Sequence, residues 1–576
     1  MNFKANPTTI GNLLSTANVK YIIPRFQREY AWELEEIKQF YNDLLENLEK
    51  DDGGVIKGAG EYFISFIVAV ANSQTSSDYQ LVDGQQRMTT ITIILSVLTH
   101  IFKELNEKEL AKACFETYVE GKDGDAKPYF KLINESPKPF FQRNIQSIKI
   151  STDYTPSTDE EKKLKDAYNF FKRNLGLEIL EKKIKIGDKS YLDLLKILRD
   201  QVLKLKVIFI TVDSIDDAYM IFETLNAKGK DLETIDLIKN KIFRILNEEH
   251  PTDEAADKWR EIKNILKSRR KTERISKFFR HFWISKYKFV TEAKIYQSFN
   301  KELKPELTTY REFVFNLEKE AKNYLKILEP LATDWPQQNE KNIFYSLQAL
   351  NLFGVEQYRS LVLSLLEAKE RNVIGTTKFV EIITAIEKFH FIFTAICSSR
   401  PSGLEGKYST FSKKIRESKD KVKTNAVIAE IKKYFNDSIP SIDLFKEKFN
   451  ELVYLKNDQK DKKLISYILG KFELKRRGTD ELVLGNITLE HILPQSEESV
   501  LERGKIGNLL PLSGAINSDI GNSDFVNKKL EFQKSELLYT KEFVEENISK
   551  SDWTAEDINN RTDKMADEAY KIIWRI

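Results

Sequence analysis

The chain has 576 residues, of which 41% are hydrophobic, so it is long enough for two or three domains with buried cores. Its 91 basic and 88 acidic residues leave a net charge of +3, which alone neither indicates nor excludes binding to nucleic acid. No apolar run approaches the roughly 18 residues that predict a transmembrane helix, and no secretory signal opens the chain. The two cysteines, Cys114 and Cys397, argue against a disulfide framework or a zinc cluster, and we expect a cytoplasmic protein without membrane contact.

The first part of the chain predicts a mixed α/β structure. The pattern over 33–48 predicts a helix, and a longer helix is expected after Asp83-Gly84, where apolar residues recur at helical spacing from Met88 to Phe102. Runs of β-favouring residues that predict strands lie at 21–24, 62–70, 79–82 and 207–212.

Outside these strands the pattern is largely helical. Residues 104–205 are charged and mostly helical, and helical periodicity continues almost throughout 215–445. The predicted fold class is α+β. Three domains are expected: a mixed α/β domain with a helical insertion at 1–214, a mainly helical domain at 215–445, and a small α/β domain at 446–576.

The most informative stretch is TLEHILPQS at 488–496, which places an acidic residue, Glu490, directly before His491. It is followed by IGNLLPL, with Asn508 seventeen residues after the histidine and Asn517 nine residues further on. An acidic residue and a histidine at a strand end, then a loop, then asparagines that enter a helix, form the layout of a ββα-metal nuclease.

A lone histidine is more often structural than catalytic, and here the joint pattern of acid, proline and spaced asparagines favours a nuclease site. The other histidines are assigned to structural roles: His100, His250, His281 and His390. Phosphodiester hydrolysis needs a base that activates water and a divalent ion that stabilises charge on the leaving oxygen. A neutral imidazole suits the base, and side-chain oxygens suit Mg²⁺ or Mn²⁺.

The residues EHILPQS, then IGNLLPL, then Asn517 resemble the HNH domain at the C-terminus of GmrSD-type restriction proteins. The resemblance implies that His491 is the general base, that Glu490 and Asn517 are metal ligands, and that Asn508 orients the histidine loop. Many HNH sites have aspartate where this chain has Glu490, and Asn522 competes for the last ligand position. Three downstream residues also fit the family's pattern as phosphate contacts: Phe525, Lys528 and Lys529.

A second constellation joins PRFQREYAW at 24–32 with DGQQR at 83–87, between a predicted strand and a helix. Gly84 permits a tight turn, and the first N–H groups of the helix favour an anion. Arg87 can fork onto phosphate oxygens, and the two glutamines add neutral donors. No Walker A pattern occurs in this region, and DGQQR alone is more often a turn that precedes a helix than a phosphate site.

Together the two boxes resemble the ParB/sulfiredoxin-like domain that opens GmrSD-type proteins, in which they meet to bind a nucleoside triphosphate. Carried over, with Asp83 assisting hydrolysis, the nucleotide site consists of Gln27, Arg28, Asp83, Gly84, Gln85, Gln86 and Arg87. A third family box, whose first residues would close over the phosphates, contains Asn226, Lys228 and Gly229, followed by Lys239 and Asn240. A helix N-terminus stabilised by turn chemistry explains this third box equally well.

Two basic runs are candidates for contact with the DNA backbone. Lys267–Lys271, with Arg280 after it, is more often a solvated helix face; for Lys475–Arg477 both alternatives stay open. Tyr30 and Trp32 are expected to be core aromatics rather than surfaces for base stacking.

The resemblance covers essentially the whole chain and implies a modification-dependent (type IV) restriction enzyme of bacterial anti-phage defence. We expect a nucleoside triphosphate (GTP, UTP, CTP or ATP, the base being undetermined) to license metal-dependent cutting or nicking of double-stranded DNA. Glucosylated bases or phosphorothioates are the expected modifications of that phage DNA. Two alternatives stay open, a nucleotide-gated DNA-binding regulatory protein with an inactive HNH domain and an NTPase effector. Whether the chain forms a homodimer is also open.

Overall fold

The chain folds into two compact units, Met1–Arg244 and Ile245–Ile576. The computed structural model describes residues 3–24, 27, 29–71, 78–135, 139–149, 155–214, 217–218, 221, 234–246, 254–399, 403–478, 487–513 and 523–576. The three domain ranges expected from the sequence stay a prediction.

A six-stranded mixed sheet organises the first unit, in the order β1-β10-β5-β6-β2-β9. Its strands are β1 (Phe3–Thr9), β2 (Lys20–Ile23), β5 (Phe63–Ala71), β6 (Asp78–Asp83), β9 (Leu132–Asn134) and β10 (Lys206–Val212). β10 is parallel to β5, and β2 is parallel to both β6 and β9, whereas β1 pairs with β10 and β5 with β6 in antiparallel fashion. The four strands predicted from apolar runs are confirmed.

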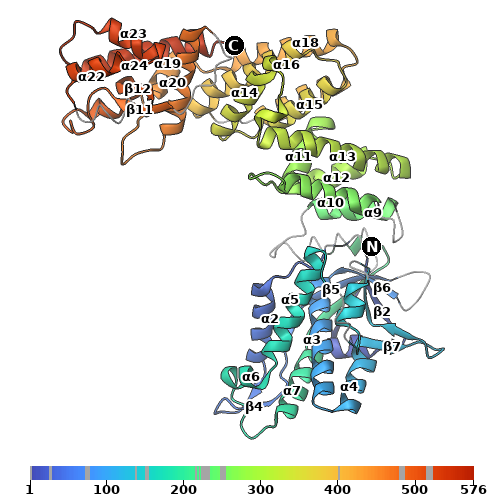
Figure 1. Cartoon of the computed structure of the whole chain (residues 1–576). Helices are drawn as coiled ribbons and strands as arrows, with labels where there is room; N and C mark the ends of the chain where they lie inside the picture. The colour runs from blue at the N-terminus through green and yellow to red at the C-terminus, as the bar shows by residue number, and fades with distance from the viewer. Residues whose placement is uncertain are drawn as a thin grey trace. The chain divides into compact units, whose positions relative to one another are not determined.

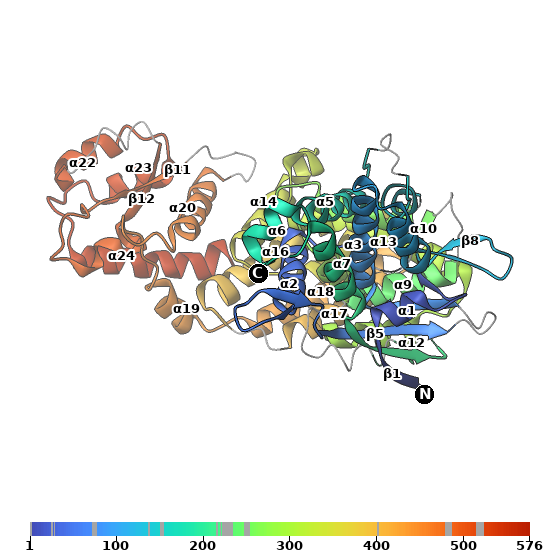
Figure 2. The same ribbon diagram turned by 90° about the horizontal axis from the view of Figure 1, so that it is seen from below.

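The edge strand β1 was not expected from the sequence. Its first five residues are exposed, so it lacks an alternating apolar pattern, and it contains Pro7. Proline cannot donate to a ladder and is tolerated at the edge of a sheet. β1 occupies that edge next to the N-terminus (Figure 2).

The long helix α3 (Gln85–Glu104) forms the centre of the helical layer and is contacted by α4, α5 and α7 (Figure 1). It is buried on all sides, so a hydrogen bond to the helix's own main chain is one way to satisfy its polar side chains. Thr92 and Thr99 meet this need by donating to the carbonyls four residues earlier. The other helices of this unit are α1 (Ile10–Ser15), α2 (Leu34–Glu46), α4 (Lys108–Cys114), α5 (Asp159–Asn174), α6 (Leu177–Lys183) and α7 (Tyr191–Leu203), and α9 (Thr234–Leu246) spans the boundary between the units.

Residues 104–205 are less uniformly helical than the sequence suggested. Besides β9 they contain the hairpin β7 (Glu120–Lys122) and β8 (Pro128–Phe130), whose strands are too short to show a period. A further two-stranded sheet joins β3 (Glu49–Lys50) and β4 (Ile56–Gly58). Short π-helical turns lie at Phe115–Val119 and Phe141–Ile145 in this unit, and at Phe391–Ile396 and Ala569–Ile573 in the second.

The second unit begins with helices, as expected. These are α10 (Glu254–Lys267), α11 (Ile275–Lys286), α12 (Ile295–Glu302), α13 (Leu307–Leu328), α14 (Lys341–Leu352), α15 (Arg359–Glu370), α16 (Thr376–His390), α17 (Leu404–Glu417), α18 (Lys421–Ser438) and α19 (Ile442–Phe449). None of the helices in the described part of the chain could serve as a membrane-spanning segment.

The C-terminal part follows with α20 (Lys462–Arg477), β11 (Ile487–His491), β12 (Leu509–Ser513), α22 (Phe525–Phe532), α23 (Leu538–Glu546) and α24 (Ala555–Glu568). β11 and β12 form an antiparallel hairpin against which α20 and α23 pack. The order β11, β12, α22 is that of a ββα unit. The α+β fold class, with a mixed α/β start, a helical middle and a small α/β C-terminus, is confirmed.

Three of the four histidines assigned to structural roles lie in the described residues, and all three are buried. Each ring lies 2.8 Å from a tyrosine hydroxyl: His100 from Tyr168, His281 from Tyr324 and His390 from Tyr408. A buried imidazole with a partner for its polar atoms is a core residue, so these three assignments are confirmed. His250 lies outside the described residues.

Candidate functional site

The hairpin places the two motif residues side by side at the end of β11. His491, the last residue of the strand, pairs with Leu509 of β12, and Glu490 pairs with Leu510. Strand alternation sends neighbouring side chains to opposite faces, so the acid and the imidazole share the strand end without stacking on each other.

The imidazole of His491 is held by main-chain and side-chain groups and is only 4% exposed. Its Nε2 lies 2.8 Å from the carbonyl oxygen of Tyr454, and its Nδ1 lies 3.1 Å from Nε2 of Gln495. Because a carbonyl only accepts, Nε2 carries the proton and Nδ1 is the basic nitrogen. Burial lowers the pKa of His491 to about 4, so the ring is neutral at physiological pH.

The Glu490 carboxylate is paired with a buried cation. Nζ of Lys528, on α22, lies 2.6 Å from Oε1 of Glu490 and 2.5 Å from the carbonyl oxygen of His491. Burial raises the pKa of Glu490, and the hydrogen bond and charge of Lys528 oppose that rise. The carboxylate therefore sits where a positive charge stabilises it.

Asn508 is fully buried and ties together the two segments that follow the strands. Its Oδ1 accepts from the N–H of Leu493 at 2.8 Å, and its Nδ2 donates to the carbonyls of Leu493 at 2.9 Å and Arg503 at 2.7 Å. The main-chain N–H of Ile492 also donates to the carbonyl of Asn508. These bonds fix the chain directly after His491, which is the arrangement that an orienting role requires.

The remaining residues predicted for this site are only partly visible. Asn517 and its competitor Asn522 lie outside the described residues. Lys528 and Lys529, expected to contact phosphate, are both buried. Nζ of Lys529 donates to three main-chain carbonyls beyond α23, those of Asn547, Ile548 and Lys550, so it stabilises the fold.

The N-terminal constellation centres on the start of α3. Gly84, the N-cap residue of α3, has a φ of +86°, which favours glycine. A Cβ at that position would also lie 2.9 Å from the Ile67 side chain, so both the backbone conformation and the close packing require glycine. Asp83 ends β6, and its Oδ1 accepts from the N–H of Gly84 at 2.6 Å. Burial raises the pKa of Asp83, while the nearby Arg87 acts in the opposite direction. Since a glycine N-cap has no side chain, it leaves the first N–H groups of the helix to other partners.

The glutamines and the arginine of DGQQR have different surroundings. Gln86 bonds the main chain of the first box, accepting from the N–H of Ala31 at 2.8 Å and donating to the carbonyl of Glu29 at 3.2 Å. Arg87 donates to the carbonyl of Phe66 at 2.8 Å. Gln85 is 5% exposed, and its Oε1 makes no hydrogen bond within the described part of the chain. The two boxes thus meet, as the resemblance implied.

The third box also reaches the first. Nζ of Lys239, on α9, lies 3.3 Å from the carbonyl oxygen of Gln27, and both residues are buried. Asn240 is buried beside it in sequence. Four residues predicted for this site, Arg28, Asn226, Lys228 and Gly229, lie outside the described residues. Tyr30 is buried and Trp32 packs against the core of the first unit, as expected.

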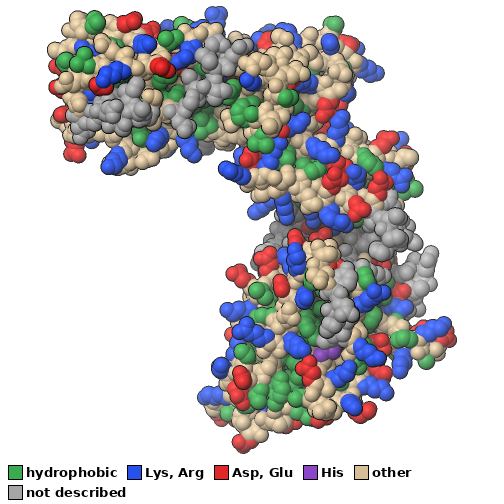
Figure 3. Space-filling view, in the orientation of Figure 1, with side chains coloured by type: hydrophobic (Ala, Val, Ile, Leu, Met, Phe, Trp, Pro, Cys, Tyr) green, Lys and Arg blue, Asp and Glu red, His purple; other side chains and the backbone are tan. Residues whose placement is uncertain are grey.

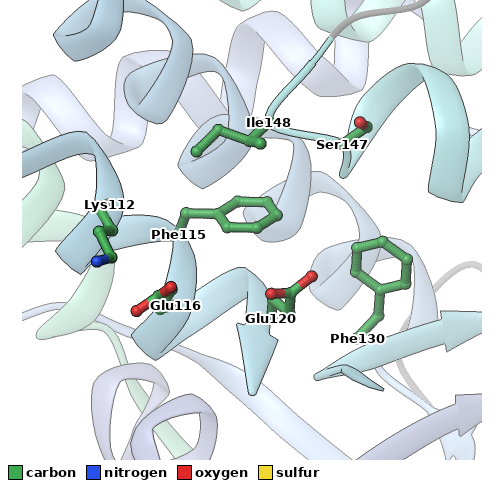
Figure 4. A pocket seen from close by; sticks show the side chains of 7 residues that line it. All are labelled: Lys112, Phe115, Glu116, Glu120, Phe130, Ser147 and Ile148. Atoms are coloured by element: carbon green, nitrogen blue, oxygen red, sulfur yellow. The ribbon is translucent and has the colours of Figure 1, made fainter. Parts of the chain in front are cut away.

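A cavity of about 260 Å³ opens elsewhere in the first unit (Figure 4). Its lining consists of Lys112, Phe115, Glu116, Glu120, Phe130, Ser147 and Ile148. None of the residues predicted to bind nucleotide is among them, so this cavity is distinct from the start of α3.

Several arginines in and after the two basic runs form intramolecular ion pairs. Arg269 binds the carboxylate of Asp334, and Arg280 binds that of Glu405. In the second run, Arg476 pairs with Glu542 and Glu568, and Arg477 pairs with Glu473. On the face shown in Figure 3, basic and acidic side chains are interspersed. These arginines are therefore positioned by the fold, which favours the structural alternative for Arg269, Arg280, Arg476 and Arg477.

Two family models match the chain over the ranges that hold these sites. The model of the N-terminal domain of the GmrSD restriction endonuclease matches residues 10–243, and that of the C-terminal domain matches residues 439–568. Together they cover more than half of the chain. The chain belongs to the GmrSD restriction endonuclease family. A search of curated proteins gave no match.

Membership in the GmrSD family makes the chain a restriction nuclease of defence, with DNA as its substrate. His491, Glu490 and Asn508 lie within the C-terminal match, and the DGQQR turn lies within the N-terminal one. The sequence did not assign a role to Gln495 or to the segment around Tyr454, although both contact His491. Gln495 belongs to the quoted motif, whereas Tyr454 gives no local signal.

Proposed function

We propose that the chain is a nucleotide-regulated, divalent-metal-dependent endonuclease or nickase that acts on modified phage DNA. The observation that carries this proposal is the His491 ring, whose Nε2–H is fixed on the Tyr454 carbonyl and whose basic Nδ1 is neutral at physiological pH. A fixed, unprotonated imidazole at the same strand end as a carboxylate supports the role of a general base in phosphodiester hydrolysis.

The proposed reaction uses these groups in the following way. Nδ1 of His491 takes a proton from a water molecule, and the resulting hydroxide attacks phosphorus as the bond to the leaving oxygen breaks. The Tyr454 carbonyl stabilises the imidazolium that forms, because it accepts from Nε2 throughout. Asn508 holds the loop after His491, so the ring keeps its place in this step.

A divalent cation fits the acid side of the site. The side chain of Glu490 is only 14% exposed. A carboxylate shielded in this way requires a positive charge nearby, which Lys528 supplies in this structure. Its oxygens are the ligand type that Mg²⁺ and Mn²⁺ prefer, with Asn517 as the proposed second ligand. When bound, the ion would stabilise negative charge on the leaving oxygen.

A nucleoside triphosphate fits the start of α3. The helix begins at a glycine that leaves its first N–H groups to the phosphates. The buried Oε1 of Gln85 lacks a donor among the described residues, and a hydroxyl or N–H of the nucleotide's sugar or base would supply one. Arg87 and Lys239 bring positive charge to the same boxes. We propose that occupancy of this site licenses the nuclease, with Asp83 assisting hydrolysis of the nucleotide, and that the protein works in the cytoplasm, with a homodimer as one possible assembly.

The decisive experiment is a cleavage assay on unmodified, glucosylated and phosphorothioated DNA, each with and without every nucleoside triphosphate, in Mg²⁺, Mn²⁺ or EDTA. Cleavage that needs a divalent ion, responds to one nucleotide and is abolished in His491→Ala is the expected result. A His491→Ala protein that still degraded DNA would refute the nuclease assignment. The wild-type protein in EDTA controls for a contaminating metal-independent nuclease.

One observation favours a second candidate, a nucleotide-gated DNA-binding regulatory protein whose HNH domain is catalytically inactive. The Glu490–Lys528 ion pair occupies the carboxylate that the ion would need. The same assay separates the candidates, because a silent site gives nucleotide-dependent DNA binding without nicking in any divalent ion. Phosphate release that proceeds without DNA would instead indicate an NTPase effector.

A further inference from the structure

Gln495 bridges the catalytic imidazole to a neighbouring segment of main chain. Its Nε2 lies 3.1 Å from Nδ1 of His491, and its Oε1 accepts from the N–H of Lys456 at 2.8 Å. Because the main-chain N–H can only donate, the amide is oriented with Oε1 toward Lys456 and with its NH₂ group toward the ring. The glutamine thus donates to the nitrogen that the proposed reaction uses as its base.

One short stretch of main chain contacts the His491 ring in two ways, directly through Tyr454 and indirectly through Gln495. The carbonyl of Tyr454 accepts from Nε2 of His491, and two residues later the N–H of Lys456 holds Gln495. The ring of Tyr454 also lies against the imidazole, with centroids 5.4 Å apart. Tyr454 fixes the orientation of His491 by itself, so the bond from Gln495 is not needed to position the ring.

A neutral imidazole has a single lone pair, on its unprotonated nitrogen. While the Gln495 amide donates to Nδ1, no water can use that lone pair, and a buried ring offers no second route. We infer that Gln495 is a latch that caps the basic nitrogen of His491 in the DNA-free protein and must be displaced before water is activated. This inference rests on the proposed nuclease function of the same site.

The segment of main chain that holds Gln495 carries two exposed lysines. Lys456 belongs to an exposed turn closed by hydrogen bonds between Leu455 and Asp458. The side chains of Lys456 and Lys460 make no ion pair with the residues that the structure describes, and both are exposed. DNA phosphates attracted to these ammonium groups would shift the turn whose N–H holds Gln495, which gives the latch a trigger.

The first test is spectroscopic and needs no cleavage. In the full chain with ¹⁵N-labelled histidine and EDTA, the Nδ1 signal of His491, assigned by its loss in His491→Ala, should lie upfield, as for a nitrogen that accepts a hydrogen bond. In Gln495→Met, a side chain of similar length without polar atoms, the signal should move, because the amide no longer donates to Nδ1, and unmodified or modified duplex DNA should move the wild-type signal toward the value of that variant. A wild-type signal at the uncapped position, or one that duplex DNA leaves in place, would overturn the latch.

The second test is the rate of single-turnover cleavage at saturating metal. Loss of one neutral hydrogen bond corresponds to roughly a threefold to tenfold change, so Gln495→Met should cut that much faster than the wild type. Gln495→Asn, which is one methylene too short to span the two partners, should do the same and guards against misfolding of the first variant. Gln533→Met is the matched control, because Gln533 is an exposed glutamine directly after α22 and lies outside the segments that bind His491 or Gln495.

The two tests separate the latch from the function on which it rests. Equal or slower cleavage by both Gln495 variants, with the control unchanged, would overturn the latch in favour of a positioning role. If the wild type cuts no DNA under any condition, the proposed function fails, and the histidine signal still decides whether Gln495 caps the ring.

Discussion

The ammonium group of Lys528 lies 2.6 Å from the carboxylate of Glu490, and Lys528 is only 1% exposed. This pair joins α22 to the end of β11, next to His491, the proposed general base. A buried ion pair adds little net stability over apolar packing, but removal of one partner leaves the other charge buried without compensation. The cost of breaking the pair should therefore exceed the worth of the pair itself.

Lys528→Met should destabilise the C-terminal domain by about 3–5 kcal/mol, the usual cost of stranding a buried charge. The double variant Glu490→Gln/Lys528→Met should recover part of that loss, because it removes both charges. Thermal and urea unfolding of the full chain measure both values. Lys534→Met is the surface control, since Lys534 pairs with Glu531 while 65% exposed and should cost less than about 1 kcal/mol. Equal losses for the single and double variants would contradict the role given to the pair.

Asn508→Ala should both destabilise the hairpin and reduce cleavage. The substitution leaves the N–H and carbonyl of Leu493 and the carbonyl of Arg503 without their side-chain partner in a dry interior, at a cost of about 2–4 kcal/mol. Because these bonds fix the loop after His491, the single-turnover rate should fall at least about tenfold even below the unfolding temperature.

The control for Asn508 is Asn527→Ala. Asn527 is exposed and binds only Asp524 in its own helical turn, so its removal should change stability by less than about 1 kcal/mol and leave the rate unchanged. An Asn508→Ala protein that folds and cuts at the wild-type rate would show that the side-chain hydrogen bonds of Asn508 are not needed to hold the loop after His491.

The nucleotide proposal makes Gln85 the most informative residue of the first unit. Gln85→Leu replaces a buried acceptor that has no partner among the described residues, so the free energy of unfolding should stay the same or rise. Nucleotide affinity should nevertheless fall by about tenfold, because a hydroxyl or N–H of the nucleotide's sugar or base loses its acceptor. Calorimetric titration with each nucleoside triphosphate measures this, and Arg87→Ala should also weaken binding.

A matched control lies on the same helix. Ser96 of α3 is likewise buried with an Oγ that lacks a hydrogen-bond partner in the described chain. It is eleven residues from Gln85, about three helical turns, so Ser96→Ala should leave nucleotide affinity unchanged. Equal affinity in Gln85→Leu and Ser96→Ala would place the nucleotide elsewhere.

The strands that sequence patterns predicted are those whose side chains are buried along a continuous run. β5 and β10 form a parallel pair inside the sheet, and such strands are apolar throughout, so composition alone identifies them. β1 and β9 could not be found in this way, because β1 is an exposed edge and β9 has three residues. Their places depend on partners more than a hundred residues away in the chain.

The same limit applies to the candidate nuclease site. His491 and Asn508 stand out because the motif places an acid, a histidine and an asparagine at short separations. Tyr454 and Lys456 lie more than thirty residues before His491 in a stretch rich in lysine and aspartate, which by composition indicates an exposed loop. Only the fold brings the main chain of that loop onto both sides of the histidine and its glutamine.

The buried His390 should make the helical part of the second unit sensitive to acid. Burial lowers its pKa to about 3, whereas an unfolded chain restores about 6.5. Below about pH 6.5 the unfolded state therefore binds a proton that the folded state does not, so stability is lost as the pH falls toward 3, at up to about 1.4 kcal/mol per pH unit.

His390→Gln should be less stable at pH 7.5, because it disturbs the bonds to Tyr408 and Thr394, yet should lose less stability between pH 7.5 and 5. Urea unfolding at several pH values measures both slopes; His281, which is also buried with a pKa well below its usual value, contributes equally to the two proteins and cancels in their difference. Parallel slopes would mean that His390 gains its proton before the chain unfolds, so that its burial does not set the acid limit of this domain.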